Sequence, residues 1–388
     1  MITSKLPNIG TNIFSFMSQL ATQHQAINLG QGFPEFNPDE KLIAAVNQGM
    51  QKGLNQYPNM AGLPQLREII SEKINSLYHH HYDAETEITI TDGATEALMA
   101  AVMAVVHSGD EVIVLEPCYD AYTPSILLAG GIPVYVPLNA PKNSAETFSV
   151  DWQRVEQAIT AKTKLLILNF PHNPTGITLK TADLDAIEAI LARHNILLLA
   201  DEVYEHIVFN QQDFLSLSTR PAIADRSFII SSFGKTFHIT GWKVGYCAAP
   251  AKLSQEFRKI HQFMVFTVCS PMQYAIAEYM QDKQTYLSLS SFYENKYTSF
   301  FKGLQKTKFK PLKSEGTFFV LADYSAISTK NEFDFACELT QHYKVGGIPV
   351  SAFYKNPNSP EANNALIRFC FAKQDKTLTN ALKQLMLI

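Results

Sequence analysis

The sequence predicts an α/β protein whose larger part is a mostly parallel sheet between layers of helices. Short runs of leucine and β-branched residues alternate with helical stretches through the middle of the chain, which is the pattern of buried parallel strands. The 388 residues suffice for one large core and a second unit. From about residue 285 the pattern changes, and we expect a smaller α+β domain there.

The residues that end each apolar run are the candidates for function, because ligands of such sheets bind beyond the carboxyl ends of the strands. The runs expected to form strands are 87–91, 111–117, 132–138, 164–170, 196–200, 227–232, 316–324, 347–353 and 365–372. Helices are expected between them, for example at 93–110 and 180–194. We predict an N-terminal arm with part of the small domain at 1–45, a large domain at 46–284 and a C-terminal small domain at 285–388.

Composition favours an ordinary globular protein over a partner of nucleic acid or membranes. The net charge of −4 argues against a DNA-binding surface. The longest apolar stretch, 97–106, is far below the roughly 20 residues of a membrane span, and the first residues lack the pattern of a signal peptide. The five cysteines are scattered and "HHHYD" at 79–83 has no spaced partner ligands. We therefore expect a reduced, cytoplasmic setting and no metal site.

The end of the first run supplies a candidate phosphate site. "TDGATEAL" follows strand 87–91. Gly93 permits a tight backbone, and Ala94 and Thr95 open a helix whose free N–H groups attract anions. A plain helix start with Thr95 in its first turn explains the same residues, so this motif alone leaves both interpretations open.

Two further runs end in residues that suit a polar ligand. In "NFPHNPTG", Asn173 falls where its amide can reach a ligand, although the segment is also an ordinary turn. In "ADEVYEHIVF", Asp201 follows five apolar residues and Tyr204 lies three positions on. A carboxylate at the edge of a buried sheet is rare unless it is paired. A helix cap or a structural salt bridge is the alternative for Asp201.

The run 227–232 leads into "SSFGKTFHITGWKVGY", where Lys235 has small or hydroxylated neighbours and a second cation, Lys243, eight positions on. A free lysine has a pKa of about 10.4 and is a poor nucleophile near pH 7. Burial and a nearby cation lower that pKa and free the lone pair. Ser232 and Lys243 are suited to hold a phosphate. A solvated surface role is the alternative for Lys235.

Together, the strand ends offer a phosphate cradle, an amide, a carboxylate, a phenol and a lysine. A phosphorylated aldehyde with a pyridine ring uses each of them. "NFPHNPTG", "ADEVY" and "SSFGKTFHITGWKVGY", with "NLGQGFPEF" at 28–36 and "LNQYPNMAGLPQLRE" at 54–68, resemble the class I/II aminotransferases of pyridoxal phosphate (PLP) fold type I. "GQGFPEF" and "GIPVSAFY" are most similar to the branch of kynurenine and bacterial methionine aminotransferases.

The resemblance implies a seven-stranded, mostly parallel sheet and a site for pyridoxal 5′-phosphate. Lys235 would bond to the cofactor aldehyde, Asp201 would pair with the ring nitrogen, and Asn173 and Tyr204 would bond the ring hydroxyl. The cradle for the phosphate and the stack on the ring would comprise Gly93, Ala94, Thr95, Ser232, Lys243 and Tyr119. Many relatives have arginine in place of Lys243; lysine keeps the charge but loses the bidentate fork. Ordinary helix packing is the alternative for Tyr119.

The resemblance also implies how substrate binds and how the protein assembles. Arg368, in "ALIRFCFA", would clamp the substrate carboxylate, with Gly32 beside it; a salt bridge at the rim is the alternative for Arg368. Phe14 and Phe16 would lie near the side-chain pocket and favour large apolar or aromatic substrates. A second arginine for a dicarboxylic substrate is not recognisable in the sequence. Tyr57 would reach the phosphate of a neighbouring subunit, which implies a homodimer.

The implied activity is transfer of an amino group from an L-amino acid to a 2-oxo acid in two half-reactions. Lys235 would act as general base and acid, and Asp201 and Tyr204 would complete the catalytic set. Methionine is the first candidate donor, followed by phenylalanine, tyrosine, histidine and kynurenine. A β-lyase of the same fold, which cleaves C–S bonds, would use nearly identical residues. A cofactor-binding regulator is a remote alternative, and the C-terminal half lacks the repeats of a Schiff-base aldolase barrel.

Overall fold

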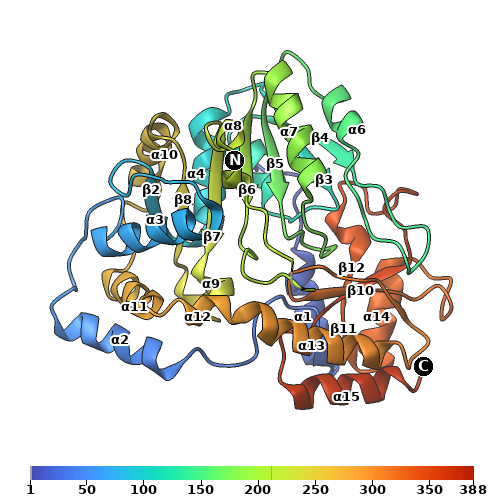
Figure 1. Cartoon of the computed structure of the whole chain (residues 1–388). Helices are drawn as coiled ribbons and strands as arrows, with labels where there is room; N and C mark the ends of the chain where they lie inside the picture. Colours follow the sequence, from blue (N-terminus) through green and yellow to red (C-terminus); the bar gives the residue numbers. More distant parts are fainter. Residues whose placement is uncertain (1, 211) are drawn as a thin grey trace.

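The larger part of the protein is built on one mixed sheet (Figure 1). A computed structural model describes residues 2–210 and 212–388. Within these residues the sheet has seven strands, in the spatial order β2 (Ile88–Thr91), β8 (Gly245–Ala248), β7 (Ser227–Ser232), β6 (Leu197–Asp201), β5 (Thr163–Asn169), β3 (Glu111–Glu116) and β4 (Ile132–Pro137). β8 runs antiparallel to both neighbours, and the other pairs are parallel. The predicted fold class is confirmed.

Helices cover both faces of this sheet because successive residues of a strand point to opposite sides. On β3, Val112 and Val114 join one apolar cluster, whereas Ile113 and Leu115 join the other. The helices that pack with Val112 are α4 (Gly93–Val105), α5 (Tyr122–Leu128) and α10 (Ala251–Met264). Those that pack on the opposite side include α3 (Pro64–Tyr78), α7 (Thr181–Arg193) and α11 (Ser270–Met280).

The structure matches the predicted runs of the large sheet closely, with two differences. Each of the six runs agrees with its strand to within one residue at either end. β8 corresponds to no predicted run, because its sequence, GYCA, is short and has few strongly apolar residues. The helix predicted at 93–110 ends at Val105, because the chain turns at Gly109, where φ is +88°, and the Asp110 carboxylate accepts from the His107 N–H at 2.8 Å.

The C-terminal part contains a four-stranded antiparallel sheet over the described residues. Its strands, in spatial order, are β12 (Ile348–Pro349), β13 (Leu366–Cys370), β10 (Phe319–Asp323) and β9 (Lys310–Pro311). The predicted run 347–353 is a strand only at its start and continues as the 3₁₀ helix η3 (Val350–Phe353). Arg368 lies on the inner strand β13, opposite Leu321 and Ile348.

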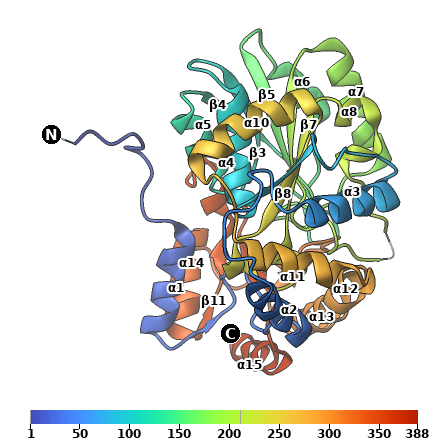
Figure 2. The same cartoon turned by 90° about the vertical axis from the view of Figure 1, so that its left-hand side faces the viewer.

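The N-terminal segment packs against this C-terminal part. β1 (Ile27–Asn28) pairs in parallel with β11 (Val345–Gly346), and Figure 2 shows α1 (Ile13–Gln23) beside α14 (Glu332–His342), while the chain ahead of α1 extends away from the body. We keep the boundaries 1–45, 46–284 and 285–388 as proposals.

The remaining helices are α2 (Glu40–Gln51), α6 (Trp152–Gln157), η1 (Leu217–Thr219), α8 (Pro221–Ala224), α9 (Phe233–Thr236), η2 (Thr240–Trp242), α12 (Gln284–Leu287), α13 (Leu289–Leu304) and α15 (Asp375–Leu385).

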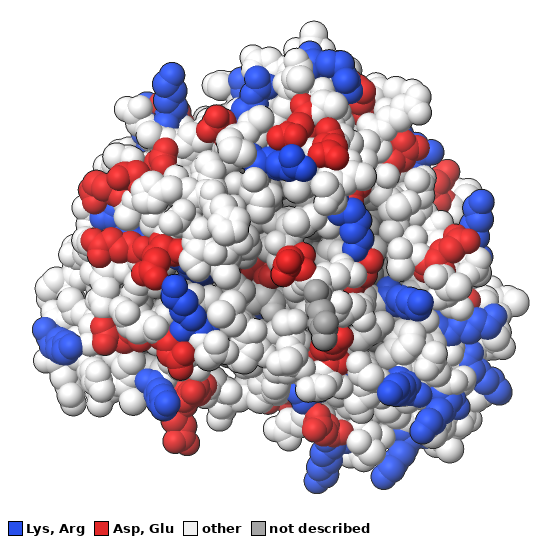
Figure 3. Space-filling view, viewed as in Figure 1, with Lys and Arg blue, Asp and Glu red and all other residues white. Residues whose placement is uncertain are grey.

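The surface carries acidic and basic side chains intermingled over much of the face seen in Figure 3. Across residues 2–210 and 212–388, none of the helices has the length and apolar character needed to span a membrane. The same residues contain no group of three or more His, Cys, Asp or Glu side chains placed to hold a metal ion. In "HHHYD", His79 is the exposed cap at the end of α3, in the left-handed conformation.

A buried ion pair joins α3 to the segment that follows β6. The Lys73 ammonium donates to the Glu205 carboxylate at 2.6 Å, and both side chains are only 3% exposed. The hydroxyls of Ser231, Tyr78 and Tyr246 donate to the same carboxylate at 2.6, 2.6 and 3.1 Å. Although burial opposes it, Lys73 and the hydroxyl donors lower the pKa of Glu205 to about 2. Because Glu205 directly follows Tyr204 in the chain, this pair stabilises the backbone behind the strand ends.

We expect Glu205→Gln to lower the free energy of unfolding by about 3–5 kcal/mol, because it leaves the Lys73 cation buried and unpaired. The control Glu256→Gln breaks an exposed pair with Lys259 and should cost less than about 1 kcal/mol. Urea denaturation measures both. Because the folded pKa lies below the usual 4.5, the contribution of Glu205 is present above about pH 4.5 and is lost as the pH falls through about 2. Equal stabilities of the two variants at pH 7 would contradict this account.

Candidate active site

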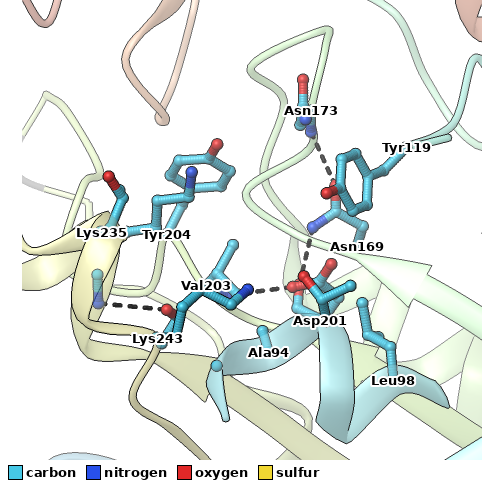
Figure 4. Close-up of a pocket in the computed structure, with 15 residues that line it drawn as sticks. Ala94, Leu98, Tyr119, Asn169, Asn173, Asp201, Val203, Tyr204, Lys235 and Lys243 are labelled. Carbon is cyan, nitrogen blue, oxygen red and sulfur yellow. Dashed lines mark hydrogen bonds between the residues drawn. The ribbon is translucent and has the colours of Figure 1, made fainter. Parts of the chain in front are cut away.

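A cavity of about 230 Å³ opens at the carboxyl ends of the parallel strands. Figure 4 shows side chains from helix α4, from the ends of β5 and β6 and from α9 meeting around it. The predicted site residues that line it are Gly93, Ala94, Thr95, Tyr119, Asn173, Asp201, Tyr204, Ser232, Lys235 and Lys243. Five separate segments of the chain thus converge on one cavity, as the positions of these residues at the strand ends predict.

Lys235 is a half-buried amine rather than a solvated surface lysine. Burial lowers its pKa to about 8, and the cations of Arg368 and Lys243 act in the same direction. The amine donates to the Gly32 carbonyl at 3.3 Å and lies 5.7 Å from the centre of the Tyr204 ring. A larger share of Lys235 is therefore unprotonated near pH 7 than of an ordinary lysine, which suits a nucleophile or a general base.

Asp201 lies at the end of β6 and is 4% exposed. Its carboxylate accepts from the Tyr122 hydroxyl at 2.6 Å and from the Val203 N–H at 3.4 Å, and the Asn169 amide donates to its backbone carbonyl at 2.9 Å. Burial raises the pKa of Asp201 to about 6 against these donors. A buried carboxylate whose hydrogen-bond donors are neutral favours a cationic partner, such as a protonated ring nitrogen, because that partner restores the ionised form.

The opposite side of the cavity has the features of an anion cradle. Helix α4 begins at Gly93, whose φ is +71° and where an added Cβ would lie 3.2 Å from the Lys243 amine. Ser232 caps α9, and its hydroxyl accepts from the Gly234 N–H at 3.2 Å. Within the described residues, Lys243 has no carboxylate within 4 Å. With Thr95 and the first N–H groups of α4, these donors fit a phosphate.

Two tyrosines line the cavity from different sides. The Tyr204 ring is fully buried and packs edge to face on Phe318, with ring centres 5.1 Å apart. Tyr119 packs edge to face on Tyr122 at 5.7 Å, and burial raises its pKa to about 12. Both phenols are therefore protonated near pH 7 and are available as donors, and both rings offer a surface for a flat ligand.

Arg368 is a fully buried guanidinium. It donates to the Asn173 side chain at 2.6 Å and to the Gly30 carbonyl at 3.0 Å, and its centre lies 3.8 Å from the Phe319 ring centre. Over the described part of the chain it has no carboxylate partner within 4 Å, and its Nε has no hydrogen-bond acceptor. Burial lowers its pKa to about 10, so it is charged near pH 7. A buried cation without an anion is costly, which favours an anionic ligand here.

The structure places the other predicted residues as follows. Gly32 approaches the site closely: an added Cβ would lie 2.7 Å from the Phe319 ring. The Phe14 ring lies 5.1 Å from the centre of the Arg368 guanidinium. Phe16 does not join it; its ring contacts Phe333 at 5.4 Å. Because residues two apart on a helix face different directions, Phe14 and Phe16 cannot line the same pocket from α1.

Tyr57 lies outside the cavity and is 82% exposed, with its ring 5.4 Å from that of Phe266. Unlike Lys243 and Ser232, Tyr57 does not line the cavity of its own chain. Its predicted contact with a neighbouring subunit stays a prediction.

Comparison with known proteins decides the family. The sequence model described as aminotransferase class I and II matches residues 24–385.

The chain belongs to the class I and II aminotransferases.

This aminotransferase is 45% identical, over 98% of the chain and 97% of the relative, to the methionine aminotransferase of Escherichia coli K12. It is 34% identical to the kynurenine–oxoglutarate transaminase of Dictyostelium discoideum, over 96% and 93% of the two chains. The crystal structure of YbdL from E. coli, reported to have a methionine aminotransferase function, superimposes with a TM-score of 0.96, 45% identity and full coverage of both chains.

Members of this family depend on PLP, and the residues that line the cavity of this aminotransferase fit that cofactor. The buried Asp201 carboxylate, the half-buried amine of Lys235 and the cradle around Gly93 and Lys243 line one cavity. Their chemistry would suit the ring nitrogen, the aldehyde and the phosphate of that cofactor, in that order. The predictions of an aminotransferase and of PLP as its cofactor are confirmed. The role of each single residue stays a prediction.

Sequence reasoning missed several residues of this aminotransferase site. The further lining residues are Leu98, Asn169, Val203, Gly234 and Thr240, and Tyr122 bonds to Asp201. Asn169 and Tyr122 had a signal: Asn169 opens "NFPHNPTG" near the end of the predicted run 164–170, and Tyr122 is the last residue of "EPCYDAY". Their partners are 32 and 79 positions away, so pairing required the fold.

Proposed function

We propose that this aminotransferase transfers the amino group of an L-amino acid with a large apolar side chain, methionine first, to a 2-oxo acid. The observation that carries the proposal is the environment of Arg368. Its guanidinium is the buried cation that suits the α-carboxylate, and the rings of Phe319, Phe353 and Phe14 lie 3.8, 4.9 and 5.1 Å from its centre. A substrate held at Arg368 thus meets aromatic surface, which favours thioether and aromatic side chains.

The residues of the chain have separable tasks in this reaction. Arg368 and Asn173 bind and orient the carboxylate, while the Lys235 amine, partly unprotonated at neutral pH, takes the α-proton of the amino acid and would return a proton to the aldehyde carbon of the cofactor. Asp201 holds a proton at the ring nitrogen, and Tyr204 donates to the ring hydroxyl. When bound, the cofactor supplies an aldehyde that accepts the amino group and a ring that accepts the electron pair.

A panel of L-amino acids with one 2-oxo acid acceptor tests the proposal. We expect methionine to give the highest kcat/KM, followed by phenylalanine, tyrosine, histidine and kynurenine, with the corresponding 2-oxo acid as product. Pyruvate and ammonia formed from a cysteine conjugate without any acceptor would instead favour a β-lyase of the same family. Faster turnover of glutamate or aspartate than of every apolar donor would contradict the proposed selectivity.

Arg368→Lys is expected to raise the KM for methionine about 10- to 100-fold with a smaller change in kcat. Lysine keeps the charge but has no fork with which to hold a carboxylate, and hydrogen bonds to charged groups contribute about 1.5–3 kcal/mol. The control Arg193→Lys alters an exposed pair with Glu156 and should leave both constants unchanged. Steady-state kinetics measure the two variants, and an unchanged KM in Arg368→Lys would remove the arginine from substrate binding.

We also propose a homodimer in a cytoplasmic setting. The support for the dimer is the exposed apolar surface at Tyr57, whose ring packs on that of Phe266, which is 41% exposed, since exposed apolar patches mark interaction sites. In the proposed dimer, Tyr57 reaches the phosphate cradle of the other subunit. Analytical ultracentrifugation tests the assembly, and a Tyr57→Phe dimer with weakened cofactor affinity is the expected result. A monomer at micromolar concentration would contradict the proposal.

A further inference from the structure

Asn12 makes two hydrogen bonds at the start of α1. Its side-chain oxygen accepts from the Phe14 N–H at 2.7 Å and caps the helix. Its amide NH₂ donates to the carboxylate of Asp120, 108 positions away and next to Tyr119 of the cavity lining. One side chain therefore fixes the first turn of α1 to the loop that follows β3.

The first turn of α1 carries Phe14, the ring that faces Arg368. Phe14 packs edge to face on Phe353 with ring centres 5.7 Å apart, and the Cys118 N–H donates to the Phe353 carbonyl at 2.8 Å. The loop after β3 thus holds both aromatic residues: Phe353 through the backbone of Cys118, and Phe14 through Asp120 and Asn12. Arg368 contacts both rings.

Asp120 is itself placed to act on this region. Its side chain is half-buried, which raises its pKa, and the Arg368 cation opposes that rise. The carboxylate accepts from Asn12 rather than from a cation, since within the described residues it makes no ion pair shorter than 4 Å. An ordinary helix cap needs no such second partner.

We propose that the hydrogen bond between Asn12 and Asp120 determines substrate specificity by holding Phe14 over Arg368. The bond closes the wall of the side-chain pocket, while Arg368 continues to bind any carboxylate. Asn12 and Asp120 act through Phe14 and are positioning residues. This inference rests on the proposed role of Arg368, and it adds the two residues that set which side chains are accepted.

Unreactive carboxylates test the bond on the holoenzyme, by isothermal titration calorimetry. Propanoate reaches Arg368 only, whereas 3-phenylpropanoate reaches both Arg368 and the wall. We expect wild type to bind 3-phenylpropanoate at least about tenfold more tightly than propanoate. We expect the affinity for 3-phenylpropanoate to fall about five- to tenfold in each of the variants Asn12→Ala, Asp120→Ala and Phe14→Ala. Their affinity for propanoate should change less than about twofold.

The double variant separates a shared bond from two independent effects. If the residues act through one bond, the double variant of Asn12→Ala and Asp120→Ala should bind 3-phenylpropanoate no more weakly than the weaker-binding single variant. The control is Asn143→Ala, because Asn143 accepts from the N–H two positions on and donates to Glu146 but lies in an exposed loop. It should bind both ligands as wild type does.

Three results would overturn the proposal. They are a loss of affinity in the double variant that equals the product of the two single losses, an equal loss of affinity for both carboxylates, or an unchanged affinity in Asn12→Ala. Each measurement reads binding rather than turnover. A wild type that binds the two carboxylates as expected but does not convert methionine would remove the proposed function and leave the bond's role standing.

Discussion

Lys235→Ala is expected to lower the rate of amino transfer by about 10³-fold or more while the protein still folds and binds its cofactor. A positioned general base contributes about 10²–10⁴-fold on its own, and the alanine also removes the covalent attachment. The fold should survive, because the amine makes one hydrogen bond among residues 2–210 and 212–388, to the Gly32 carbonyl. The rate is measured in single turnovers with methionine and cofactor at saturation.

Two controls separate the loss of chemistry from the loss of binding. Added ethylamine should restore part of the rate in Lys235→Ala, because a small amine can occupy the vacated space and carry the proton. Lys243→Ala removes the neighbouring cation of the cradle instead, so it should weaken cofactor binding but retain most of the rate at saturating cofactor. Normal turnover of Lys235→Ala without added amine would refute the assignment.

Asp201→Asn is expected to lower kcat by about 10²–10³-fold. The substitution keeps the shape of the side chain but removes the negative charge that stabilises a protonated ring nitrogen, and a buried charge of this kind acts strongly because water does not screen it. Pre-steady-state kinetics with methionine should show slow proton removal and an unchanged affinity for 3-phenylpropanoate, since Arg368 is untouched.

Tyr122→Phe is the matched control for Asp201, because it removes the 2.6 Å hydrogen bond and keeps the carboxylate. That hydrogen bond stabilises the ionised form and lowers the pKa of Asp201, so its loss raises the pKa. Protonation then begins at higher pH, and the acid limb of the kcat/KM profile should move upward with a loss of less than about tenfold at pH 8. An Asp201→Asn variant no slower than Tyr122→Phe would contradict the role of the charge.

The sequence predicted the site well where chemistry depends on the end of a strand. Asp201 and Lys235 follow apolar runs and Ser232 ends one, and parallel strands bring such ends to one edge of a sheet whatever the connections between them. The bounds of those runs were accurate for the same reason: a strand buried on both faces is apolar throughout and stops where polar residues begin.

The sequence was less informative where contacts depend on packing between distant segments. The hydrogen bonds from Tyr122 to Asp201 and from Asn12 to Asp120 join residues 79 and 108 positions apart, and no local pattern specifies such pairs. Phe14 and Phe16 were indistinguishable by residue type, and the helical rotation between them placed only Phe14 at Arg368. β8 was missed because its residues do not form a distinct apolar run.

The absorption spectrum of the purified protein with PLP, before and after L-methionine is added without any 2-oxo acid, tests the central claim most directly. The account predicts that the band of the lysine-bound cofactor converts to the band of pyridoxamine phosphate as 2-oxo-4-methylthiobutanoate appears in equal amount. A lysine-bound band that persists while pyruvate or a thiol accumulates from another amino acid would contradict the proposed transamination and favour a lyase. If no such band forms at all, Lys235 does not bond to the cofactor and the account fails.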